Sequence, residues 1–125
     1  MIDFSNVDEI TFNQLKEVLA KRGRLPIRVV TSSMEPVIMA GDTLEVVSKT
    51  DELKKFDIIV FWRDSKLVVH YIWGKNFLQG VSYTTRSLEM PNHNELPVPE
   101  CNILGYADGV NIGFWTRVRL QLFYG

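Results

Sequence analysis

The sequence predicts a mainly β protein, with antiparallel strands in a coiled, partly closed arrangement and one short helix near the amino terminus. Two observations lead to this fold class. After Gly23, short segments rich in β-branched and aromatic residues recur, and polar or glycine-containing turns separate them. Before Gly23, apolar residues repeat at helical spacing instead. Short strands with frequent turns favour an antiparallel fold, because parallel strands need long crossover connections.

The helix is expected over about residues 11–22. Thr11 begins a Thr-Phe-Asn-Gln capping box, in which its hydroxyl and the amide of Gln14 satisfy backbone donors at the start of the helix. Two basic residues at the other end suit the helix dipole, and Gly23 supplies the stop. The apolar residues of the segment favour a helix that covers the core.

The rest of the chain contains seven segments with strand character. They are residues 25–31, 43–47, 57–62, 66–73, 81–85, 102–106 and, approximately, 112–123. The last segment alternates polar and apolar residues, as a half-buried edge strand does. Such an unpaired edge is compatible with a monomer or a weak dimer. No linker or repeat interrupts the pattern, so residues 1–125 are expected to form a single domain.

Composition and charge exclude several classes of protein. Hydrophobic residues make up 46% and charged residues 23%, which is typical of a globular domain. The formal net charge of −1 argues against a nucleic-acid partner. The apolar runs are far shorter than the roughly 18 residues of a membrane span, and the acidic amino terminus does not resemble a secretory signal. A single cysteine, Cys101, cannot form an internal disulfide, which fits a cytoplasmic location.

A hydroxyl-rich strand end is the first candidate for chemistry. The segment Thr31-Ser-Ser-Met-Glu-Pro-Val-Ile38 places Ser33 just before a stiffened turn, because Pro36 fixes its own φ and biases Glu35 toward an extended conformation. A nucleophile benefits from being held still in this way. Taken alone, the same pattern is an ordinary serine in a turn.

His70 is the second candidate. It interrupts an otherwise apolar hairpin formed by residues 57–62 and 66–73. An isolated histidine there is usually a core residue bonded to a backbone carbonyl. Together with a stiffened serine it becomes a candidate general base, since imidazole titrates near neutral pH and can accept a hydroxyl proton.

Four motifs follow one another along the chain. They are Ser33-Met34-x-Pro36, Gly41-Asp42, the hairpin that ends in Leu67-Val68-Val69-His70, and Pro97-Val98-Pro99 with the following residues to Gly105. In this order they resemble the LexA/signal-peptidase superfamily of serine peptidases. The similarity covers about residues 27–106, and the family fold is a mostly antiparallel, coiled β structure. That fold agrees with the strand pattern of this sequence.

The resemblance implies roles for three residues. Ser33 would be the nucleophile of an acyl-transfer reaction on an extended peptide. The hydroxyl of Thr31 would help the backbone N–H of Ser33 to form the oxyanion hole. His70 stands where many relatives have a lysine base, which is similar to the endoplasmic-reticulum and archaeal type of signal peptidase. No cofactor is implied.

The third catalytic member is not fixed by the resemblance. Histidine-type relatives carry an aspartate in a Gly-Asp-Asn segment before the Pro-Val-Pro stretch, but here the Gly-Asp pair aligns with Ser87-Leu88. Carboxylates and amides can both orient an imidazole. The candidates are Glu89, Glu95, Asn92 and Asn94.

Two further residues are expected to have no chemical role. His93 lies in a polar Asn-His-Asn turn and should be solvated, whereas Cys101 should be a small buried residue at a strand start. Together with His70 they show no metal-ligand spacing, so no metal site is expected.

Two functions from different classes remain open. The first is a serine endopeptidase that processes a peptide precursor or a partner protein. The second is a non-catalytic peptide-binding module that kept the fold, motivated by the missing Gly-Asp pair. A DNA-binding repressor remnant is a weaker third hypothesis, because the residues before Ile27 encode only one short helix and the net charge is near zero.

Overall fold

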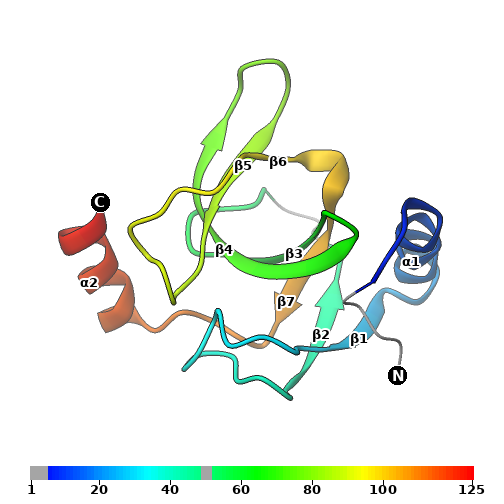
Figure 1. The fold of residues 1–125 in the computed structure, drawn as a ribbon, viewed down its shortest axis with the longest axis horizontal. Coiled ribbons are helices and arrows are strands. Elements are labelled where there is room, and N and C mark those ends of the chain that lie inside the picture. Colours follow the sequence, from blue (N-terminus) through cyan, green and yellow to red (C-terminus); the bar gives the residue numbers. More distant parts are fainter. Residues whose placement is uncertain (1–5, 49–51) are drawn as a thin grey trace.

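The computed structural model describes residues 6–48 and 52–125. Seven strands form one antiparallel sheet in the order β1-β2-β7-β3-β4-β5-β6. The strands are β1 (Arg24–Arg28), β2 (Thr43–Val47), β3 (Ile58–Arg63), β4 (Lys66–Asn76), β5 (Ser82–Arg86), β6 (Val98–Pro99) and β7 (Ile103–Asp108). The mainly β, antiparallel class is therefore confirmed. The sheet coils but does not close into a barrel, and β1 and β6 form its two edges (Figure 1).

The long hairpin of β3 and β4 is the centre of the sheet. β3 pairs with β4 on one side and with β7 on the other, and its residues Ile58 to Phe61 are all buried. Alternate residues of β3 face two different cores, because Ile58 and Val60 belong to one apolar cluster and Ile59 and Phe61 to another. A strand covered on both faces is expected to be continuously apolar rather than alternating, as this one is.

The amino-terminal helix α1 (Glu9–Arg22) begins two residues earlier than expected. Asp8, not Thr11, is the N-cap: its carboxylate accepts the backbone N–H of Thr11 at 2.7 Å. The predicted cap failed because the helix starts earlier in the chain: the Asp8 carboxylate caps the backbone N–H of Thr11, and Thr11 itself lies inside the helix. Gly23 ends the helix with φ 76°, as predicted. The side chains of Phe12, Leu15 and Leu19 are buried and pack into the larger of the two apolar clusters.

The carboxyl-terminal segment is a helix, so the strand predicted for residues 112–123 is wrong. α2 (Phe114–Tyr124) lies at the opposite side of the molecule from α1 (Figure 1). The alternating pattern was misleading because alternation over a few residues does not by itself decide between strand and helix; in the helix, Leu120 is the residue that is fully buried. Because these residues form a helix, they offer no unpaired strand edge through which a weak dimer could form.

The last turns of α2 are attached to the sheet through polar contacts. The guanidinium of Arg86 donates to the carbonyl of Tyr124 at 2.8 Å, and Lys55 donates to the side chain of Gln121 at 2.8 Å. Leu120 is the one residue of α2 that is fully buried. Neither helix of residues 6–48 and 52–125 is long and apolar enough to cross a membrane.

Cys101 is exposed, so its predicted burial is wrong. The predicted strand of residues 102–106 begins only at Ile103, and Cys101 lies before it in a short 3-10 turn, η1 (Glu100–Asn102). A residue in such a surface turn does not face either core. The strand β6 just before this turn was not predicted, because two residues carry no readable alternation.

Close contact between β7 and β2 is expected to make Gly105 intolerant of substitution. A Cβ atom at this position would lie 2.4 Å from the carbonyl oxygen of Val47 and 2.9 Å from the side chain of Val46. Gly105→Ala should therefore lower the free energy of unfolding by about 1–3 kcal/mol, measured by urea denaturation. Gly74→Ala is the matched control in another strand of the sheet, β4, because a Cβ there meets no atom within 4 Å. Equal stability of the two variants would contradict the prediction.

Candidate active site

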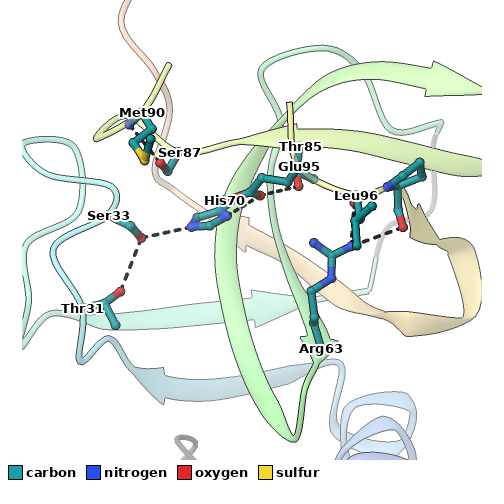
Figure 2. A network of polar contacts seen from close by, with 10 residues as sticks. Thr31, Ser33, Arg63, His70, Thr85, Ser87, Met90, Glu95 and Leu96 are labelled. Carbon is teal, nitrogen blue, oxygen red and sulfur yellow. Dashed lines mark hydrogen bonds and ion pairs between the residues drawn. The ribbon is translucent and has the colours of Figure 1, made fainter. Parts of the chain in front are cut away.

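Ser33 and His70 lie within hydrogen-bond distance, although 37 residues separate them in the chain. The Ser33 Oγ and the His70 Nε2 are 3.2 Å apart, and Figure 2 shows the two side chains pointing toward each other. Ser33 follows the extended segment that continues from β1, and His70 lies in the middle of β4. The sequence predicted this pair of residues, and the structure brings them together.

The backbone of Ser33 is held on both sides. The next side chain, Met34, is only 1% exposed and packs into the larger core, as does Ile38 at the end of the same turn. The carbonyl of Ser33 accepts the backbone N–H of Glu89 at 3.1 Å. An apolar anchor and a backbone hydrogen bond thus fix the residue that carries the hydroxyl, as a preorganised nucleophile requires.

Glu95 completes a chain of hydrogen bonds behind His70. Its carboxylate oxygen Oε1 lies 2.7 Å from Nδ1 of His70. When Nδ1 donates its proton to this carboxylate, Nε2 carries a lone pair and can accept the hydroxyl proton of Ser33. The arrangement Ser33–His70–Glu95 has the connectivity of a catalytic triad, in which the acid sets the tautomer and orientation of the imidazole.

The other three candidates for the third member do not contact His70. The side-chain oxygen of Asn94 instead accepts Nε of Arg86 at 2.6 Å. Asn92 is exposed, and Glu89 is exposed at the mouth of the cleft described below. Ser87, aligned with the missing glycine, is buried, and its hydroxyl accepts the backbone N–H of Met90.

Thr85 is a site residue that the sequence reasoning missed. It is fully buried, and its hydroxyl donates to the same Oε1 of Glu95 at 2.7 Å, while its carbonyl accepts the backbone N–H of Glu95 at 3.1 Å. Arg63 holds the next two residues, because its guanidinium donates to the carbonyls of Leu96 and Pro97 at 2.6 and 3.2 Å (Figure 2). No sequence motif marks either residue, since each acts through tertiary contacts.

The surroundings of Glu95 favour its ionised form. Burial by itself would raise the pKa of this carboxyl. The hydrogen bond and charge of His70, the hydrogen bond from Thr85 and the more distant charge of Arg63 outweigh burial, so the pKa lies below its usual value. An ionised Glu95 can stabilise the imidazolium that forms when His70 accepts a proton.

The hydroxyl of Thr31 lies beside that of Ser33. Its Oγ1 is 3.4 Å from Oγ of Ser33, which is longer than the 2.5–3.0 Å or so of a good hydroxyl–hydroxyl hydrogen bond. Thr31 is exposed at the same end of the cleft, where the expected oxyanion would form. The structure therefore places Thr31 next to Ser33, as the proposed oxyanion hole requires.

A cleft of about 430 Å³ leads to Ser33 and His70. One wall is residues 27–33, which run from the end of β1 to Ser33, and the other is the beginning of β4, residues 66–70; Glu89 lines the same cleft. β5 pairs with β4 only from Tyr71 onward, so among the described residues no strand lies beside the cleft-side edge of residues 66–70. A free strand edge next to a nucleophile is a natural place for an extended peptide.

The remaining candidates lie outside this site. His93 is exposed, as predicted, and Cys101 is exposed in η1. Within the described part of the chain, no group of three or more His, Cys, Asp or Glu side chains is arranged to hold a metal ion.

Stability is expected to depend on the charge of Glu95. Because the pKa of this carboxyl is lower in the folded than in the unfolded chain, its ionised form stabilises the folded protein at neutral pH. This contribution is lost as the pH falls through the lowered pKa. Wild type should therefore exceed Glu95→Gln in urea midpoint near pH 7, and the difference should shrink near about pH 3. A difference of the same size at both pH values would contradict this account.

The geometry is the basis for assigning a function to this chain. No family model matches the sequence, and no curated protein matches it either. The contacts of Ser33, His70 and Glu95 therefore carry the functional assignment.

Proposed function

We propose that this protein is a serine endopeptidase of the LexA/signal-peptidase type. The observation that carries the proposal is the continuous set of contacts from Ser33 Oγ through both nitrogens of His70 to Glu95. The family resemblance of the four sequence motifs points in the same direction. Histidine-type members of that family carry an aspartate that this sequence lacks. Glu95, on the loop before β6, would take its place.

The reaction follows from the positions of these groups. The Oγ of Ser33 attacks the scissile carbonyl carbon while Nε2 of His70 accepts the hydroxyl proton. The backbone N–H of Ser33 and the hydroxyl of Thr31 stabilise the negative charge on the carbonyl oxygen. The imidazolium then gives its proton to the leaving amine as the C–N bond breaks. A water molecule, deprotonated by His70, hydrolyses the acyl-enzyme and regenerates Ser33.

An extended peptide is the substrate class that the cleft fits. The free edge of β4 offers backbone donors and acceptors to a peptide strand, which would lie between residues 66–70 and residues 27–33. Such pairing recognises the backbone of the substrate, whereas the cleft walls select among its side chains. The protein is thus proposed to process a peptide precursor or an extended segment of a partner protein.

A serine-directed acylating probe tests the nucleophile directly. Wild type treated with a fluorophosphonate should gain the mass of one adduct on Ser33, and Ser33→Ala should gain none. Ser82→Ala, a variant of β5 outside the cleft, should be labelled like wild type. His70→Ala should be labelled about 10²–10⁴-fold more slowly, because the hydroxyl loses its base. His93→Ala serves as the matched histidine control.

The same experiment separates the two functional classes. An adduct that depends on both Ser33 and His70 supports the peptidase. A folded wild-type protein that forms no adduct from neutral to alkaline pH would overturn the proposal and favour a peptide-binding module without catalysis.

Glu95 is expected to be the third member of the triad. Glu95→Gln should lower the labelling rate by about 10²–10⁴-fold while the fold is retained, since the amide no longer fixes the imidazole tautomer or stabilises its charge. Asn92→Ala should label like wild type, because Asn92 lies away from His70. The circular dichroism spectrum of each variant checks the fold. A normal rate in Glu95→Gln, or a large loss in Asn92→Ala, would reject this assignment.

A further inference from the structure

We propose that the cleft selects peptides by their charge pattern, with a basic side chain beside the scissile bond and an acidic side chain about four residues away. The inference rests on the proposed function and names its substrate class. It comes from the distribution of charged side chains along the two walls. Apart from His70, the charged residues of the lining are Arg28, Lys66 and Glu89.

Glu89 places a negative charge at the catalytic end of the cleft. Its backbone N–H is bonded to the carbonyl of Ser33, so the residue cannot lie far from the nucleophile. Its side chain is exposed and forms no ion pair within the described residues. Glu95, in contrast, is engaged by His70 and Thr85. Glu89 is therefore the carboxylate that is available to a substrate side chain beside the reacting bond.

Lys66 and Arg28 place positive charge at the other end. Lys66 is four residues before His70 along β4, which corresponds to about 13 Å at 3.3 Å per residue. Arg28 is five residues before Ser33 on the opposite wall. Both side chains are exposed, and neither forms an ion pair within residues 6–48 and 52–125. The two cations thus line the end of the cleft that is remote from the triad.

The part of the cleft between these charges is mainly apolar. Val29 and Val30 contribute from one wall, and Leu67, Val68 and Val69 from the other. An extended peptide spans about 13 Å with four residues, so one bound strand reaches from Glu89 to the two cations. Side chains between its two charged positions meet apolar walls. Because each charge of the peptide meets an unpaired opposite charge, one register is favoured over its neighbours.

Binding to Ser33→Ala tests the inference without any turnover. The probes are two labelled peptides of serine, threonine and alanine. One carries a lysine and, four residues later, a glutamate, and the other carries these two charges in the exchanged order. Fluorescence anisotropy at low salt should show one of the two peptides binding about fivefold more tightly than the other, and added salt should weaken the preference. Equal affinity of the two peptides, or no binding of either, would overturn the inference.

Charge reversal in the cleft should reverse the preference. In the Ser33→Ala background, Glu89→Lys combined with Arg28→Glu and Lys66→Glu should bind the other of the two peptides more tightly. Glu17→Lys on the exposed side of α1 is the matched control and should keep the original preference. An unchanged preference in the reversed variant would contradict the assignment of these three residues.

Failure of this inference can be distinguished from failure of the proposed function. Labelling of wild-type Ser33 by the fluorophosphonate reports on the triad alone and does not depend on peptide charge. Labelling without a charge preference rejects the charge pattern and leaves the peptidase intact. A charge preference without labelling supports the charge pattern, while the catalytic proposal fails.

Discussion

The hydrogen bond between Glu95 and Nδ1 of His70 is the interaction on which the rest of the site depends. It fixes which imidazole nitrogen is free to accept a proton, and it holds the ring toward Ser33. Thr85 of β5 donates to the carboxylate of Glu95, and Arg63 of β3 donates to the carbonyls of the two residues that follow it. Together with His70 of β4, three strands therefore support this hydrogen bond. The sheet is therefore the support of the site as well as the core of the protein.

The free edge of β4 explains why the site lies where it does. β5 begins to pair with β4 only after His70, and the chain before Ser33 runs along the opposite side of the space that remains. Ser33 on one wall and His70 on the other are brought together at the end of that space. A peptide that fills the space would add a strand to the sheet and reach the reactive groups at its end.

The sequence predicted much of the fold but only part of the site. Strand segments and the residues Ser33 and His70 are readable, because alternation, turn chemistry and stiff motifs are local properties. Residues 112–123 were misjudged, since a short alternating pattern is compatible with a helix as well as with a strand. Glu95 could not be selected among four candidates, because its loop position is set by contacts with Thr85 and Arg63 rather than by strand register.

The segment that carries Glu95 is held less firmly than the strands around it. Residues 87–97 contain no helix or strand, and they are joined to the sheet mainly through Thr85, Arg63 and Arg86. Such a unit opens at a lower free energy than the paired strands around it. Arg86 also donates to the carbonyl of Tyr124 at the end of α2, so this helix is expected to open together with the loop. The loop is therefore expected to open before the sheet melts as temperature or denaturant concentration rises, and hydrogen exchange would resolve the two steps.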